Sequence, residues 1–239
     1  MSGETTPVRF SVDGYRLAGV WHPAEPKGAP IVIGVHGLLA DKGSPKQIAL
    51  ASELNRHGIG YFRFDHRGCG ESGGNLSSDT TLEARCRDLA AAVETLQRLA
   101  EFQEHRLGLF GSSFGGTVCL AFSGRQWKGP LATWAAPVRS RSLEKPLKTQ
   151  GGGAPHPRLP HLEFDLAGTM GGTAPCLVLH GSADEVVPQE AAGEIVRARM
   201  GEQRMHLIEG CDHRITLPEH QQVFLRLVTD WFVRWLGRA

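Results

Sequence analysis

The sequence predicts an α/β fold with a mostly parallel, twisted sheet, and three observations support this prediction. Strand-like and helix-like segments alternate along the 239 residues. Several strand-like segments are short continuous apolar runs, which is the pattern of parallel strands buried on both faces. The helix-like segments carry apolar residues every three or four positions, so each helix has one face that can pack on the sheet. Such alternation places helices on both faces of the sheet.

The composition is that of an ordinary globular protein. Hydrophobic residues make up 41% of the chain and charged residues 21%, and the length allows one α/β domain with a sizeable core. We therefore expect a single domain over residues 1–239. Lys and Arg number 26 against 25 Asp and Glu, so neither nucleic acid nor an anionic membrane is expected as a partner.

The sequence also carries signals about the cellular compartment. Its first residues, MSGETTPVRF, lack the basic and apolar regions of a signal peptide. No apolar run approaches the roughly 18 residues that a membrane span needs. The five cysteines are scattered and include no CxxC pair, so neither a disulfide framework nor a structural zinc site is expected. A cytoplasmic protein with reduced thiols is the expectation.

Apolar periodicity and turn residues define the expected elements. A hairpin is expected around Asp13-Gly14, a dipeptide that suits a tight turn. The strands expected after it are residues 31–37, 60–65, 106–110, 131–137, 176–181 and 204–210. The expected helices begin after Ser44 and near Thr80, and cover residues 114–123, 189–200 and 219–236.

Two of these helices carry signals of a capping box at their first turn. Ser44 and Gln47 are expected to cap one helix, and Gly58 stands where that helix should end. Thr80 and Glu83 are expected to cap the next helix.

The stretch LGLFGSSFGGTV, residues 107–118, joins an expected strand to an expected helix. Within it Gly111, Ser113 and Gly115 fit the pattern G-x-S-x-G, in which a sharp turn exposes the central side chain and small residues prevent collisions. Ser112 does not fit, because it would need glycines at two positions that hold phenylalanine. Ser113 is therefore the predicted nucleophile, and Ser112 is interpreted as a small residue that fills the turn.

A serine hydroxyl needs a base to remove its proton, and histidine has a suitable pKa. The chain has 11 histidines, and His213 is the best placed. It follows the last expected strand and precedes the final helix, at the sheet edge where ligand sites of such folds lie. His66 and His180 also stand near strand ends but lack a comparable context.

The imidazole of such a base is held in one tautomer by a carboxylate. Asp184 follows the expected strand 176–181 at the same edge as His213. Its alternatives are the neighbouring Glu185, the adjacent Asp212 and the more distant Asp65. Asp184 is the predicted acid because the chain order of serine, acid and histidine is the one used on open α/β sheets.

Acyl transfer further requires N–H donors for the tetrahedral oxyanion. The backbone N–H of Phe114, directly after the predicted nucleophile, is one candidate. The second is expected from Leu38, in the loop after strand 31–37, whose side chain is then free to line an acyl pocket. His36 is interpreted as a supporting residue.

These motifs carry a resemblance to a known family. The segments HGLLADK, FDHRGCGESGG, GSSFGG, HGSADEVVP and GCDHR resemble those of α/β-hydrolases of the serine-hydrolase type, over nearly the whole chain. The similarity is to the small-cap branch, which includes carboxylesterases, feruloyl esterases, monoacylglycerol lipase-like enzymes and serine aminopeptidase-like sequences. It implies the α/β-hydrolase fold with an N-terminal antiparallel hairpin, the nucleophile Ser113, the acid Asp184, the base His213, and oxyanion donors at Leu38 and Phe114.

The resemblance gives the turn DHRGCGES a structural role, in which Asp65, Arg67 and Ser72 tie the loop beneath the site by hydrogen bonds. Residues 137–174 are expected to form a short cap insertion whose Gly- and Pro-rich middle, GGGAPHPRLPH, is irregular. Apolar cap residues are expected to lie over a pocket: Leu143, Leu147, Leu162, Phe164, Leu166 and Met170. No metal site is predicted, because the spacing of His156, His161 and Asp165 matches none that is familiar.

The expected function is a serine hydrolase that cleaves carboxylic esters of small to medium acyl groups through an acyl-enzyme. Its partner is a small-molecule ester, it needs no cofactor, and its oligomeric state is left open. An amidase or peptidase would use the same residues, as would a perhydrolase side activity. A non-catalytic binding protein of the same fold is the alternative from another class, although such proteins usually lack one of the three side chains.

Overall fold

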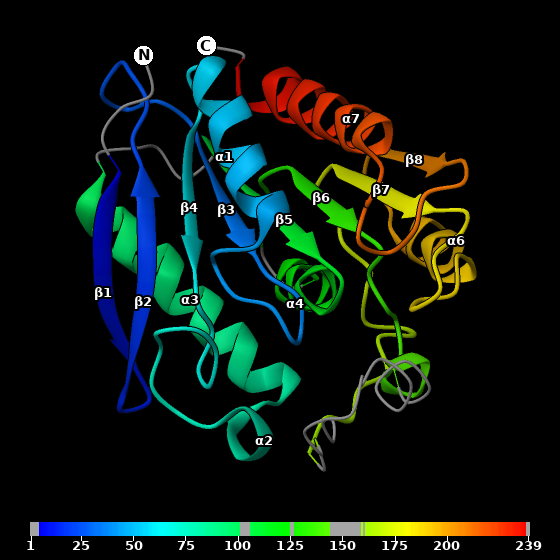
Figure 1. Cartoon of the computed structure of the whole chain (residues 1–239), viewed down its shortest axis with the longest axis horizontal. Coiled ribbons are helices and arrows are strands. Elements are labelled where there is room, and N and C mark those ends of the chain that lie inside the picture. The colour runs from blue at the N-terminus through cyan, green and yellow to red at the C-terminus, as the bar shows by residue number, and fades with distance from the viewer. Residues whose placement is uncertain (1–4, 101–105, 125–126, 144–158, 160, 238–239) are drawn as a thin grey trace.

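The computed structural model describes residues 5–100, 106–124, 127–143, 159 and 161–237 (Figure 1). Its sheet has eight strands in the order β1-β2-β4-β3-β5-β6-β7-β8. The strands are β1 (Thr6–Val12), β2 (Tyr15–His22), β3 (Ile31–Val35), β4 (Gly60–Phe64), β5 (Leu107–Ser112), β6 (Leu131–Trp134), β7 (Cys176–Gly181) and β8 (Gln203–Ile208). The α-helices are α1 (Pro45–Arg56), α2 (Leu76–Asp79), α3 (Leu82–Leu99), α4 (Phe114–Ser123), α6 (Glu190–Ala198) and α7 (Pro218–Leu236), and Ser140–Leu143 forms a short 3₁₀ helix.

Strand directions confirm the predicted sheet. β1 and β2 form an antiparallel hairpin, and β2 pairs with β4 in antiparallel fashion. Every pair from β4 through β8 is parallel. Asp13 and Gly14 both have positive φ angles, 51° and 82°, as a two-residue hairpin turn with the twist of the strands requires.

Helices cover both faces of the sheet. One apolar cluster packs between the sheet and α3, α4 and α6, and a second packs between the sheet and α1 and α7. Figure 1 shows α1 in front of the sheet and α3 behind it. Among the described residues, no helix is both long enough and apolar enough to cross a membrane.

The parallel strands bring separate loops to one edge of the sheet. β3, β5, β7 and β8 point the same way, and their arrowheads lie along one side in Figure 1. The residues that follow these strands are 36–44, the turn at Ser113, 182–189 and 209–217. Segments far apart in the sequence therefore meet where ligand sites of open α/β sheets lie.

The first predicted capping box is wrong. Ser44 occupies the N-cap position of α1, but its side chain makes no capping hydrogen bond. Gln47 is buried, and its Oε1 accepts a hydrogen bond from the Tyr61 hydroxyl on β4 instead. Gly34 leaves space for this contact, because a Cβ there would overlap both side chains. Gln47 therefore packs between α1 and the sheet and does not cap the helix.

The second predicted capping box is displaced by one residue. Thr81, and not Thr80, caps α3, with its Oγ1 accepting from the N–H of Ala84 at 3.0 Å. The short helix α2 was not expected, and Thr80 is the residue that ends it. Because α2 uses the residues before Thr80, the next helix begins one position later.

The ends of the expected cap lie against each other. Arg139 and Asp165 form an antiparallel bridge, flanked by hydrogen bonds from Ser140 N to Phe164 O and from Leu166 N to Val138 O, both 2.9 Å. Four of the expected cap residues are buried in the core: Leu143, Leu162, Leu166 and Met170. Their place over a pocket stays a prediction. Residues 144–158 and 160, with Leu147, His156 and most of the Gly- and Pro-rich segment, lie outside the described residues.

Candidate active site

Ser113 occupies a strained turn between β5 and α4. Its φ is +53° and its ψ is −127°, a region that residues other than glycine rarely adopt. The glycines around it are required by space: a Cβ on Gly111 would overlap the carbonyl of Gly115, and a Cβ on Gly115 would overlap the carbonyl of Val35. Ser112 is the buried last residue of β5, so Ser113 alone is presented by this turn.

The main chain around Ser113 is firmly held. Its N–H donates to the Trp134 carbonyl at the end of β6, over 2.7 Å. α4 begins at the next residue, Phe114, so the positive end of the helix dipole lies at Ser113. Negative charge that develops beside Ser113 is therefore favoured.

His213 and Asp184 are brought together from two loops. The His213 Nδ1 lies 2.8 Å from Asp184 Oδ2. The other carboxylate oxygen, Oδ1, accepts from the N–H groups of Val186 and Val187, each at 2.8 Å. The Asp184 side chain is fully buried, and that of His213 is 13% exposed.

The hydrogen bonds keep Asp184 ionised. Burial pushes its pKa upward, but the bonds from His213 and from the two backbone N–H groups outweigh burial and leave the pKa below its usual value. An ionised acceptor makes Nδ1 the protonated nitrogen of a neutral His213 ring. Nε2 is then the nitrogen that can accept a proton.

None of the alternative carboxylates contacts the His213 ring. Asp212 accepts from the N–H of Thr216 at 2.7 Å, and Asp65 accepts from the N–H of Lys42 at 2.6 Å. Glu185 accepts from the main-chain N–H of His213 at 3.2 Å, which holds the backbone and leaves the ring to Asp184.

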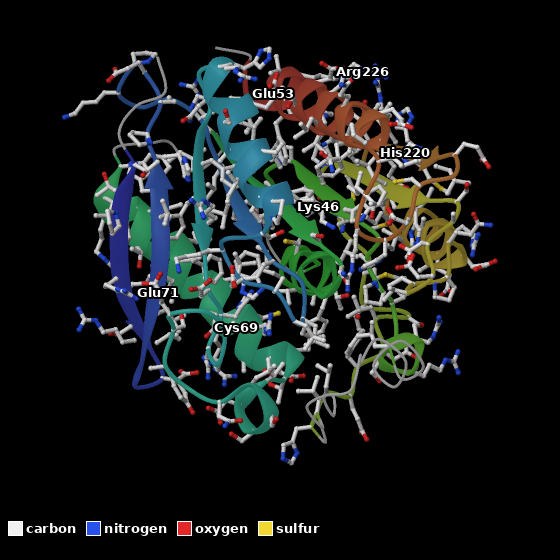
Figure 2. All side chains as sticks on the ribbon, viewed as in Figure 1. Lys46, Glu53, Cys69, Glu71, His220 and Arg226 are labelled. Carbon is white, nitrogen blue, oxygen red and sulfur yellow. The ribbon has the colours of Figure 1, made fainter. Side chains whose placement is uncertain are left out.

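The carbonyl of His213 has two side-chain donors that the sequence did not indicate. Trp134 Nε1 donates to it at 2.9 Å and Lys46 Nζ at 3.3 Å. Lys46 lies at the start of α1 (Figure 2), and burial lowers its pKa to about 8. Since the Trp134 carbonyl also accepts from Ser113, a single residue of β6 anchors the backbone of both Ser113 and His213.

Ser113 also adjoins the loop after β3. Its Cβ lies 3.3 Å from the position that a Cβ on Gly37 would occupy. Within the described part of the chain, no hydrogen bond joins Ser113 Oγ to the His213 ring. Such bonds are often long in enzymes without substrate, and their formation stays a prediction.

Two backbone N–H groups near Ser113 are free. Neither the N–H of Leu38 nor that of Phe114 meets an acceptor among the residues that the structure describes. Their side chains point into the core, with Phe114 against Phe164 at a ring distance of 5.3 Å. The Leu38 side chain is buried in the core cluster, and the expectation that it lines an acyl pocket stays a prediction.

His36 holds the loop that carries Leu38. Its Nε2 accepts from the N–H of His66 at 3.1 Å, so its Nδ1 carries the proton and donates to the Gly37 carbonyl at 2.7 Å. Burial lowers the pKa of His36 well below its usual value, which keeps the ring neutral. These contacts agree with a supporting role.

Hydrogen bonds tie the turn after β4, as predicted. Asp65 accepts from the backbone N–H groups of Lys42 and Glu71, at 2.6 and 2.9 Å, and the Ser72 hydroxyl donates to the Asp65 carbonyl at 2.7 Å. Arg67 pairs with another residue, donating to Asp88 from Nε at 2.8 Å. Figure 2 shows Glu71 beside β1 and β2. Asp65 therefore has a structural role.

No metal centre is evident in the described part of the chain. There, no three His, Cys, Asp or Glu side chains are grouped so that they could hold a metal ion. The structure thus contains a strained serine, a carboxylate-bound histidine and two free N–H groups at one sheet edge.

Comparisons with known proteins find a family and curated relatives whose sequences are similar to this chain. The family described as serine aminopeptidase, S33, matches residues 25–140. The uncharacterized protein YfhR of Salmonella typhi is 30% identical over 225 residues, which cover 88% of this chain and 75% of YfhR.

Solved structures match over nearly the full length. The α/β hydrolase GrgF from Penicillium sp. sh18 superimposes with a TM-score of 0.83 and 18% identity, covering 98% of this chain and 99% of GrgF. Est1E from Butyrivibrio proteoclasticus, solved with bound ferulic acid, superimposes with a TM-score of 0.77 and 19% identity, covering 97% of this chain and 100% of Est1E. At these identities, the two structures establish the fold and nothing finer.

Proposed function

The chain belongs to the α/β-hydrolase superfamily, and on that premise we propose that it is a serine hydrolase that cleaves carboxylic esters of small to medium acyl groups. One observation carries the proposal: the strained Ser113 stands beside two backbone N–H groups that have no acceptor among the described residues. A free N–H is ordinary at the first residue of a helix, but a turn that only connected β5 to α4 would not need the strained backbone of Ser113. Both are useful where an oxyanion forms.

The proposed reaction proceeds through an acyl-enzyme. Ser113 Oγ attacks the ester carbonyl while His213 Nε2 takes its proton, and Asp184 stabilises the imidazolium that forms. The N–H groups of Leu38 and Phe114 bind the oxyanion. His213 then protonates the leaving alcohol, and a water activated by the same ring releases the acid. No cofactor takes part.

The first test is hydrolysis of nitrophenyl esters of graded chain length, with an aromatic ester included because Est1E binds ferulic acid. Ser113→Ala should lower kcat by about 10³-fold or more. Ser112→Ala is the matched control and should retain most activity, because Ser112 is the buried end of β5. A fluorophosphonate probe should label wild-type protein at Ser113. Labelling at Ser112, or no labelling of folded protein, would contradict the proposal.

A peptidase or amidase is the second candidate, favoured by the description of the matching family as serine aminopeptidase. The same side chains would then cleave a C–N bond, for which His213 must protonate a poorer leaving group. A pair of substrates with one acyl group, an ester and an anilide, separates the two. We expect the ester to have the higher kcat/KM, and a higher value for aminoacyl anilides would favour the peptidase.

The cytoplasm remains the proposed compartment. No disulfide joins any of the five cysteines, all of which lie in the described part of the chain, and this suits a reducing environment. Mass spectrometry of thiols in protein purified without reductant measures this directly, and a disulfide formed in the producing cell would argue against it.

A further inference from the structure

A buried arginine lies beneath the loop that carries Leu38. Arg85, on α3, has a relative exposure of 0%. Its Nη2 donates to the Leu38 carbonyl at 3.2 Å and to Cys69 Sγ at 3.3 Å, and its Nη1 lies 3.5 Å from the Gly37 carbonyl. Figure 2 shows Cys69 in the turn after β4, close to α3.

The charge of Arg85 is not neutralised by a partner of its own. Asp88 is the acidic side chain that influences it, but Asp88 is bonded to Arg67 at 2.6 Å and to His66 at 3.2 Å. Within the described residues, Arg85 forms no ion pair. A buried, unpaired cation is costly, and a neutral side chain could fill the same space. The bonds to the Leu38 and Gly37 carbonyls explain the presence of arginine at this position, because its guanidinium can donate to two acceptors at once.

Peptide geometry connects those carbonyls to the proposed oxyanion donor. The Gly37 carbonyl and the Leu38 N–H belong to one planar trans peptide, so they point in opposite directions. His36 donates to this carbonyl at 2.7 Å, and Arg85 approaches it from α3 while binding the next carbonyl along the chain. Fixing both carbonyls fixes the Leu38 N–H, and Ser113 lies next to the same loop at Gly37, where an added Cβ would be 3.3 Å from Ser113 Cβ.

We propose that Arg85 is a positioning residue, which holds the peptides on either side of Leu38 so that the Leu38 N–H receives the oxyanion formed at Ser113. The inference rests on the proposed serine hydrolase function. Arg85 touches neither substrate nor reacting atoms, and acts through the loop. Its guanidinium also lies 5.5 Å from the Phe114 ring centroid, so one cation is adjacent to both residues whose N–H groups are the proposed donors.

Arg85→Met removes the donors and retains much of the apolar volume. Removal of a whole oxyanion donor lowers kcat by about 10²- to 10³-fold, so misplacement of one should lower it by about 10- to 100-fold. KM should stay within about 2-fold, because an interaction made in the transition state changes kcat and not ground-state binding. Arg85→Lys keeps the charge but cannot fork onto two carbonyls, and should give an intermediate kcat.

Arg199 provides a matched control elsewhere in the fold. It is 4% exposed and donates to the carbonyls of Met170 and Ala174, at 3.4 and 3.1 Å. Its Nε, like that of Arg85, has no hydrogen-bond partner within the part of the chain that the structure describes. It also binds Ser123 Oγ at the far end of α4, ten residues and therefore about 15 Å from Ser113 along the helix axis. Arg199→Met and Arg199→Lys should lower the melting temperature but leave kcat within about 2-fold of wild type.

The experiment measures kcat, KM and melting temperature for wild type and the four variants, and the inhibition constant of phenylboronic acid, which forms a tetrahedral adduct with a nucleophilic serine. Arg85 variants should bind the boronic acid more weakly by about the factor lost in kcat. If Arg85→Met does not fold, Arg85→Lys against Arg199→Lys decides the same question. Equal kcat in the Arg85 and Arg199 variants would overturn the inference while the proposed function stands. Wild-type protein that neither hydrolyses esters nor reacts with a fluorophosphonate would refute the proposed function, and the inference with it.

Discussion

The substitution Asp184→Asn would place a hydrogen-bond donor opposite His213 Nδ1, where the wild type has an acceptor oxygen. Asp184 Oδ1 accepts from two backbone N–H groups, those of Val186 and Val187, at 2.8 Å each. In Asp184→Asn the amide oxygen takes that place, because an NH₂ group there would face two donors. The NH₂ group then points at His213 Nδ1, where Oδ2 lies at 2.8 Å in the wild type. Nδ1 must become the acceptor, and the proton moves to Nε2.

A ring protonated at Nε2 cannot take the Ser113 proton. On the proposed mechanism we therefore expect kcat to fall by about 10⁴-fold, the loss that the wrong histidine tautomer causes in a Ser-His-Asp protease. The two backbone bonds persist, but all three hydrogen bonds change from charge-assisted to neutral, while the cost of burying a charge disappears, and we expect a net loss of about 1 kcal/mol. For a chain of this size, that loss lowers the melting temperature by about 2–4 °C. Activity thus falls far more than stability.

The pH dependence follows from the sign of the Asp184 shift. Its pKa is lower in the folded protein than in the unfolded chain, so its stabilising effect is fully present above the unfolded pKa of about 3.9. That effect is lost as the pH falls through the folded pKa. The gap in melting temperature between wild type and Asp184→Asn should be constant from pH 7 to about 5 and close below about 4.

Asp212→Asn is the matched control for this substitution. Asp212 adjoins His213 and also has a pKa below its usual value, but it binds Thr216 and not the ring. We expect its kcat within about 3-fold of wild type. The reasoning is refuted if folded Asp184→Asn keeps a tenth of the wild-type kcat, or if Asp212→Asn loses as much as Asp184→Asn. Nitrophenyl ester hydrolysis with thermal melting on the same preparations gives both quantities.

Two further predictions concern the backbone anchor and the cap. Trp134→Phe removes the shorter of the two side-chain hydrogen bonds to the His213 carbonyl and should lower kcat by about 3- to 10-fold. Trp231→Phe removes a buried indole that has no hydrogen-bond partner among the described residues, and should lower only the melting temperature. Equal kcat in the two variants would contradict the anchor. Exchange of residues 151–160 should shift relative activity among esters and leave fluorophosphonate labelling of Ser113 intact. That prediction fails if labelling is lost in protein that circular dichroism and melting show to be folded, or if the enzyme acts only on emulsified long-chain lipid.

The sequence predicts well whatever depends on neighbours in the chain. The hairpin at Asp13-Gly14 and the turn at Ser113 both have the positive φ angles that their residues imply. The glycines around Ser113 stand where any Cβ would collide with backbone. Asp184 and His213 follow parallel strands, so fold class alone places them at one edge of the sheet.

Contacts across the fold were less predictable. Gln47 resembles a capping residue in sequence, yet it is buried against Tyr61. Arg85 looks like one more charged position on an amphipathic helix, because its carbonyl partners are 47 and 48 residues away. Trp134 is an apolar strand residue in sequence, and its bond to His213 spans 79 residues. Such partners depend on how helices and loops pack, for which single-sequence patterns carry no signal.

Arg85 and Asp184 together make the site complementary to one distribution of charge. In the proposed attack, negative charge develops on the oxyanion at the Leu38 N–H, and positive charge develops on the His213 ring. Arg85 holds the loop that carries the Leu38 N–H, and Asp184 binds the His213 ring. The charged side chains of Arg85 and Asp184 are both buried, so water screens their charges weakly. The neutral serine and imidazole of the ground state have no such charge separation, so the Leu38 N–H that Arg85 positions and the Asp184 carboxylate stabilise the proposed transition state more than bound substrate. For this reason, substitutions at either position should appear in kcat and leave KM almost unchanged.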